Sequence, residues 1–165
     1  RVGEEMVIRA DMIFASNDKT LIVADNLAKY YAININTGEV IWSKSNVAPF
    51  NSQVKIIKDK FFVIDFENIL RCFSLKNGKE IWNFKTEKSF IKSQQKLSFI
   101  INNNKIVFIN TLGDISSVDI ETGNLIWKTP TQSSTIYENY FSLQNSDVFY
   151  SNNSIFFSNN QNEFF

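Results

Sequence analysis

Short runs of apolar residues alternate with clusters of polar turn residues along most of the chain. Three of these runs have equal lengths and end in Asp or Asn: Leu21–Asp25, Phe61–Asp65 and Ile106–Asn110. They are rich in Val, Ile and Phe, and Asn-Asn, Asn-Gly and Thr-Gly pairs separate the apolar segments around them. Short runs of this composition between turn residues predict β-strands. Because most positions in a run are apolar, we expect strands packed on both faces.

Each run opens a repeated segment that ends in tryptophan. The three copies are gap-free windows of 22 residues, 21–42, 61–82 and 106–127, and their tryptophans are spaced by 40 and then 45 residues. Glycine precedes the tryptophan by four positions in every copy, and isoleucine precedes it directly. The pairs are Gly38 and Trp42, Gly78 and Trp82, and Gly123 and Trp127. A fourth copy starts at Ile155 and reaches only part of the window, at Glu163–Phe165.

A period of 40 to 45 residues with short strands predicts the four-stranded antiparallel blades of an all-β propeller. In the second copy we expect strands at Val54–Ile57, Phe61–Asp65, Ile69–Leu75 and Glu80–Phe84. The turn before the last strand contains Gly78, which takes positive φ without steric cost and suits a tight hairpin with a bulge.

The chain is therefore expected to be one partial propeller over residues 1–165. Its blades lie at about 6–44, 53–86, 96–129 and 147–165, with the last incomplete. Met6–Ala10 is a candidate strand of a neighbouring blade, and Thr129–Asp147 is expected to hold a longer surface loop.

About four blades are visible, and the last of them is incomplete, whereas complete propellers usually carry four to eight blades. The sequence thus predicts a fragment with open blade faces. Open faces and unpaired strand edges favour association, so we expect two copies to pair into a closed ring as a homodimer.

The amino-acid composition excludes several kinds of functional site. Lys+Arg and Asp+Glu are both 17, so the net charge is zero, which argues against a nucleic-acid surface. The sequence contains no histidine and a single cysteine, Cys72. A Ser-His-Asp triad, an internal disulfide and a multi-cysteine metal site are therefore excluded. No apolar run approaches the about 20 residues of a membrane-spanning helix, and Arg1–Glu5 does not resemble a signal peptide.

Short polar residues occupy equivalent positions in the copies and are expected to cap turns. One set lies four residues before each glycine: Asn34, Ser74 and Asp119. The other ends each apolar run: Asp25, Asp65, Asn110 and Asn159. Cys72 fills the position of Ala32 and Ser117, so we expect a small, half-buried side chain there.

The phrase Ala-x-Asn/Asp-x-x-Thr-Gly-x-x-x-Trp resembles the tryptophan-docking motif of pyrroloquinoline-quinone (PQQ)-type propellers, some of which have no cofactor. The first copy matches best, the third has Ser117 in place of Ala, and the second is loosest, with Asn77 in place of Thr. The resemblance implies that each tryptophan stacks on the glycine turn of a neighbouring blade. We therefore interpret the three tryptophans as structural residues. The resemblance also implies that the complete ring has seven or eight blades.

Members of this family differ in function, so the fold does not choose between them. The resemblance favours a non-catalytic scaffold like the BamB-type lipoproteins of outer-membrane protein assembly. It implies a periplasmic or outer-membrane location, envelope partners such as the β-barrel assembly pore subunit, and no cofactor. An extracytoplasmic ligand-binding or sensor propeller is the first alternative. A fragment of a PQQ-dependent dehydrogenase is the second, although the sequence has no acidic cluster suited to its Ca²⁺.

Overall fold

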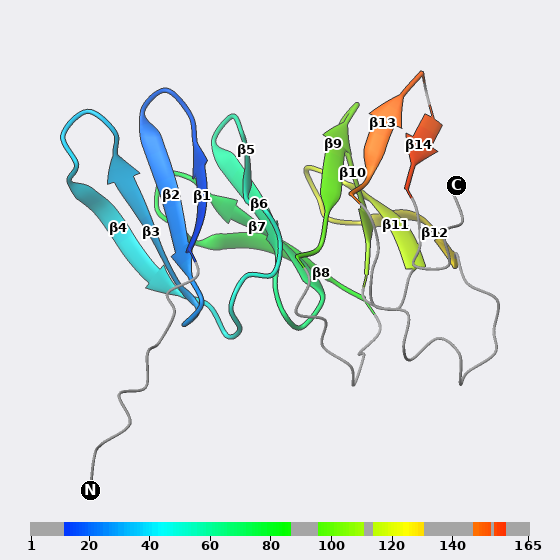
Figure 1. Cartoon of the computed structure of the whole chain (residues 1–165), viewed down its shortest axis with the longest axis horizontal. Helices are drawn as coiled ribbons and strands as arrows, with labels where there is room; N and C mark the ends of the chain where they lie inside the picture. Colours follow the sequence, from blue (N-terminus) through cyan, green and yellow to red (C-terminus); the bar gives the residue numbers. More distant parts are fainter. Residues whose placement is uncertain (1–11, 87–95, 111–113, 131–146, 153, 158–165) are drawn as a thin grey trace, which may run out of the picture.

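The computed structural model describes residues 12–86, 96–110, 114–130, 147–152 and 154–157. Within them every regular element is a β-strand, and no helix could span a membrane. Three four-stranded sheets and one two-stranded sheet stand side by side in chain order, like the blades of a fan (Figure 1).

Every sheet is an antiparallel meander in which each strand pairs with the next along the chain. The first sheet contains β1 (Met12–Ser16), β2 (Thr20–Asp25), β3 (Lys29–Asn34) and β4 (Val40–Ser45). The second contains β5 (Lys55–Ile57), β6 (Lys60–Ile64), β7 (Ile69–Ser74) and β8 (Glu80–Lys85). The third contains β9 (Phe99–Asn102), β10 (Lys105–Ile109), β11 (Asp114–Asp119) and β12 (Leu125–Pro130). The fourth pairs β13 (Phe149–Ser151) with β14 (Ser154–Phe156).

These sheets confirm the predicted all-β blade architecture. The four strands expected in the second repeat agree with β5–β8 within one residue at each end, which is the ordinary uncertainty of a strand boundary. Met6–Ala10, Asn159 and Glu163–Phe165 lie outside the described residues, as does most of Thr129–Asp147.

The hydrophobic core is divided between the junctions of neighbouring sheets. Alternate side chains of one strand point to opposite faces, so β6 sends Phe61 and Val63 to the first sheet and Phe62 and Ile64 to the third. All four side chains are fully buried. Both faces of each central sheet are covered, which explains why its apolar runs are continuous.

Each four-stranded sheet has a bulge at the same place, three residues after the turn glycine. Gly38, Gly78 and Gly123 have φ of 74°, 65° and 72°. The register then shifts so that the isoleucine before each tryptophan has no opposing residue on the third strand. Its side chain stays exposed, at 51% for Ile41, for example. The invariant Ile-Trp pair thus combines a bulged residue with a docking residue.

The second sheet also buries a charged network. Asp65 is fully buried and accepts a hydrogen bond of 2.7 Å from Nε of Arg71, which is itself 8% exposed. Nη1 of Arg71 contacts Glu80 at 2.5 Å, and Nδ2 of Asn46 in the first sheet's outgoing loop donates to Asp65 at 3.4 Å. The equivalent β3 and β11 residues, Tyr31 and Ser116, carry no charge.

Replacing Arg71 with alanine is expected to lower the free energy of unfolding by about 3–5 kcal/mol, because Asp65 would stay buried without its cationic partner. Urea unfolding followed by tryptophan fluorescence measures this loss. The exposed Lys79→Ala variant is the control and should change stability by less than about 0.5 kcal/mol. A loss for Arg71→Ala as small as that of the control would show that the network is not important for stability.

Candidate functional site

Two tryptophans connect neighbouring sheets by packing and hydrogen bonding. The indole of Trp42 in β4 lies on Gly78 of the second sheet, where an added Cβ would be 2.7 Å from the ring atom Cζ3. Its Nε1 donates a hydrogen bond of 3.0 Å to the carbonyl of Leu75. Trp82 in β8 repeats this on the third sheet: a Cβ on Gly123 would be 2.5 Å from Cε3, and Nε1 donates to the carbonyl of Ile120 at 3.2 Å.

The third strand provides room for each indole. The residues opposite Trp42, Trp82 and Trp127 are Ala32, Cys72 and Ser117, and all three are fully buried. A larger side chain here would collide with the ring beside it, which explains why the repeat keeps this position small.

The burial of Cys72 corrects the expectation of a half-buried side chain. Desolvation raises the pKa of the Cys72 thiol to about 12, with the Lys60 ammonium lowering it slightly. The thiolate is therefore strongly disfavoured at neutral pH, and Cys72 serves as a packing residue.

Tyr30 reinforces the first junction. Its hydroxyl donates a hydrogen bond of 2.9 Å to the carbonyl of Gly78, and its ring meets Trp42 edge-on at 5.7 Å between centroids. Burial, followed by the nearby Glu80 carboxylate, raises the pKa of Tyr30 to about 12, while Arg71 opposes this. The sequence does not reveal this contact, because nothing in the repeat marks the hydroxyl's partner, which lies 48 residues away.

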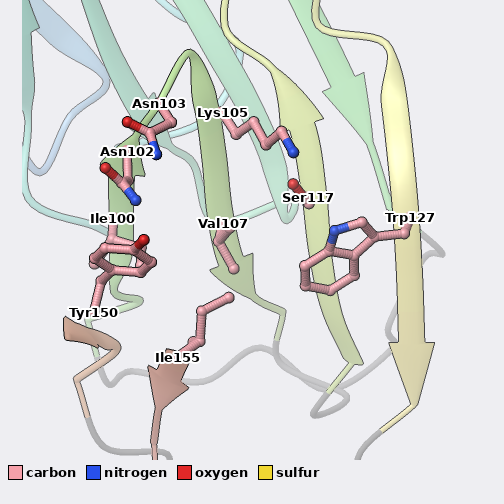
Figure 2. A pocket seen from close by; sticks show the side chains of 9 residues that line it. All are labelled: Ile100, Asn102, Asn103, Lys105, Val107, Ser117, Trp127, Tyr150 and Ile155. Atoms are coloured by element: carbon pink, nitrogen blue, oxygen red, sulfur yellow. The ribbon is translucent and has the colours of Figure 1, made fainter. Parts of the chain in front are cut away.

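Two predicted docking residues have no such partner within the described residues. Gly38 is exposed, and no described atom lies within 4 Å of the Cβ it would carry. Trp127 is 37% exposed and borders a hollow of about 160 Å³ between the third and fourth sheets. Figure 2 shows Trp127 across this hollow from Tyr150, with Ile155 between them below. The predicted residues thus form two docked pairs, Trp42–Gly78 and Trp82–Gly123.

The turn residues act through backbone hydrogen bonds. Oδ1 of Asn34 accepts from the amide of Asn36 at 2.9 Å, and Oδ1 of Asp119 accepts from the amides of Glu121 and Thr122 at 3.0 and 2.8 Å. The hydrogen bonds from Thr122 contribute most to holding the pKa of Asp119 below its usual value.

The second copy caps its turn differently. Ser74 forms backbone hydrogen bonds with Lys79 and Gly78, and its hydroxyl forms none within the described residues. The side-chain cap comes instead from Asn77, whose Oδ1 accepts from the amide of Lys79 at 3.0 Å.

The acids that end the apolar runs also cap turns. Oδ1 of Asp25 accepts from the amides of Leu27 and Lys29, and Oδ1 of Asp65 from those of Glu67 and Ile69. Asn110 likewise accepts from the amide of Asp114 at 3.0 Å. Among the described residues no three Asp, Glu or Cys side chains gather as they would around a metal ion.

A groove of about 520 Å³ crosses the first strands of the second, third and fourth sheets. Lys55, Asn102, Asp147, Phe149 and Tyr150 are among the residues that line it. Phe149 and Tyr150 are 62% and 39% exposed. The sequence does not reveal this groove, because its lining residues differ in type between the copies and form no recurring motif.

Comparison with known proteins assigns the chain to a family. Residues 2–165 match the family described as outer membrane protein assembly factor BamB, which is the PQQ-type repeat family. The chain belongs to this family. No sequence among the curated proteins matches it.

Solved structures agree on the propeller fold. BamB from Moraxella catarrhalis superposes with a TM-score of 0.74 at 13% identity, covering 90% of this chain and 46% of that one. This chain therefore spans about half the length of that BamB. The computationally designed Ika4 protein gives 0.71 at 11% identity, with 95% and 90% covered. A europium-containing methanol dehydrogenase gives 0.60 at 17% identity, with 73% and 24% covered.

The contribution of docking to stability can be isolated with two glycine variants of this BamB-family chain. Gly38→Ala and Gly78→Ala both force alanine into positive φ, which costs roughly 1–2 kcal/mol. Only Gly78→Ala also drives a Cβ into an indole, so it should cost about 1–3 kcal/mol more than Gly38→Ala. Equal losses in urea unfolding would show that the Trp42 contact is loose enough to absorb the methyl group.

Proposed function

We propose that this chain is a non-catalytic propeller scaffold for protein–protein contacts in the cell envelope, of the outer-membrane protein assembly type. Membership of the BamB family across residues 2–165 is the observation that carries the proposal. The docking geometry supports it, because the most distinctive residues of the repeat join blades, as in Trp42–Gly78 and Trp82–Gly123. These residues make a rigid support whose strands and loops remain available to partners.

The proposal places the protein on the periplasmic side of the outer membrane, as a lipoprotein of the β-barrel assembly machinery. Its partner would be the pore subunit of that machinery, alongside other envelope proteins.

A quinone dehydrogenase is less well supported. The methanol dehydrogenase superposes at 17% identity over 24% of its own length, and such a likeness shows the fold alone. A Ca²⁺–quinone site needs several converging carboxylate and carbonyl oxygens. In the described ranges Asp25 and Asp65 are engaged by turn amides, and no acidic cluster converges there. These residues do not fit the cofactor.

We further propose that two copies pair through the outward face of the first sheet. Met12 and Phe14 on β1 are 47% and 59% exposed, and Gly38 has an uncovered surface among the described residues. The corresponding surface of the second sheet is covered by the first sheet. Val54, which is equivalent to Phe14, is buried there. Contact with a second copy would remove this apolar area from water.

Light scattering on the purified chain tests this pairing. We expect a dimer at micromolar concentration, and Phe14→Asp should convert it to a monomer because the charge would be buried at the interface. A clean monomer for the unmodified chain at the same concentration would refute the pairing and leave the scaffold proposal intact.

Crosslinking in the native cell envelope, followed by mass spectrometry, tests the scaffold proposal. The full-length protein is expected to yield crosslinks to the β-barrel assembly pore subunit, and cells lacking the tagged protein give the background. Recovery of only a small molecule or a signalling protein would contradict the assembly role. It would favour the ligand-binding or sensor alternative.

A further inference from the structure

Each sheet meets its neighbours through two adjacent positions of its first strand, which lie six and seven residues before the repeated window begins. Adjacent side chains of a strand point to opposite faces, so one position faces the following sheet and the other faces the preceding sheet. The residues that face a following sheet are Ala15, Lys55 and Ile100. The residues that face a preceding sheet are Val54, Phe99 and Val148.

At each inner junction these two positions come together. Ala15 and Val54 pack in one apolar cluster, and the equivalent residues of the third and fourth sheets pack in another. Between the second and third sheets, Nζ of Lys55 lies 5.2 Å from the centroid of the Phe99 ring, which is a cation–π contact. The residue that faces a preceding sheet is at most 6% exposed at all three junctions. A neighbouring sheet is therefore what buries this position.

The same two positions are uncovered on the outward faces of the first and fourth sheets, which lie at opposite ends of the fan (Figure 1). Phe14 holds the position that faces a preceding sheet and is 59% exposed, whereas Phe149 holds the position that faces a following sheet and is 62% exposed. Each has an apolar cross-strand neighbour, Val23 beside Phe14 and Phe156 beside Phe149. Within the described ranges, neither outward face is covered by a further sheet.

We propose that the outward face of the fourth sheet in one copy docks on the outward face of the first sheet in a second copy, with Phe149 packed against Phe14. The inference rests on the proposed pairing of two copies and specifies which surfaces meet. The contact repeats between copies the junction that Lys55 and Phe99 form within one chain. Each copy contributes one face of each kind, so two head-to-tail contacts close the pair into a ring.

The head-to-tail arrangement is favoured over contact between two first-sheet faces. Pairing of two first-sheet faces would set Phe14 against its own equivalent and leave Phe149 in water. The head-to-tail contact removes both aromatic side chains from water, and a buried aromatic residue contributes on the order of 150–250 Å². It also sets a residue that faces a following sheet against one that faces a preceding sheet, as at every inner junction of the described chain.

Single charges at the two positions test whether both faces take part. Phe14→Lys and Phe149→Asp should each halve the mass that light scattering gives for the unmodified dimer at micromolar concentration, because a charge would be buried without a partner. Ile81→Asp is the matched control, since Ile81 is 47% exposed on β8 of the second sheet, and it should leave the dimer intact. Circular dichroism of each variant shows that loss of pairing is not loss of folding.

A one-to-one mixture of the Phe14→Lys and Phe149→Asp proteins tests the geometry. In a head-to-tail pair of the two variants, one contact is unmodified and the other joins opposite charges, so the mixture should regain the mass of the dimer. If two first-sheet faces meet instead, the Phe149→Asp protein stays dimeric by itself and the Phe14→Lys protein gains no partner. A dimeric Phe149→Asp protein, or a mixture whose mass does not rise, would overturn the inference.

Failure of this contact and failure of the proposals beneath it give different results. If the Phe149→Asp protein stays dimeric while the Phe14→Lys protein is monomeric, the pairing stands and only the head-to-tail geometry is wrong. If the unmodified chain is monomeric, the pairing and its geometry are both refuted. The scaffold function depends on neither result, because crosslinking to the assembly pore subunit decides it.

Discussion

The contact between an indole and a glycine of the next sheet determines the rest of this structure. A four-stranded meander has two broad faces and cannot bury both alone, so its stability depends on neighbours at each side. Trp42 and Trp82 supply that connection with a flat ring over a residue that lacks Cβ and a hydrogen bond from Nε1 to a turn carbonyl. The buried apolar strands and the glycine turns with positive φ are consistent with the same requirement.

The repeat made much of the fold predictable, since a fixed distance from glycine to tryptophan specifies turn, bulge and docking residue together. The strands of the second copy were predicted within a residue because turn residues bound each run. Individual departures from the repeat were not predictable. Asn77 caps a turn in place of Ser74, and Tyr30 reaches the Gly78 carbonyl, because such contacts depend on how neighbouring sheets approach in space.

The candidate groove was also beyond sequence reasoning, for a physical reason. Its lining residues Lys55, Ile100 and Phe149 come from equivalent positions of three sheets without sharing chemistry. A motif is recognised by residues that recur, whereas this surface is defined by residues that differ between copies. A propeller that keeps its docking residues constant and varies its first strands can present a distinct surface on a common support, which agrees with a scaffold function.

A double-mutant cycle between Trp42 and Gly78 tests the central claim most directly. The unfolding free energy is measured for Gly78→Ala in the unmodified chain and again in a Trp42→Ala background. Removal of the indole removes the clash, so the cost of Gly78→Ala should fall to that of Gly38→Ala, where only backbone strain acts. An unchanged cost in the Trp42→Ala background would contradict the account, because it would show that the two residues do not interact across the junction.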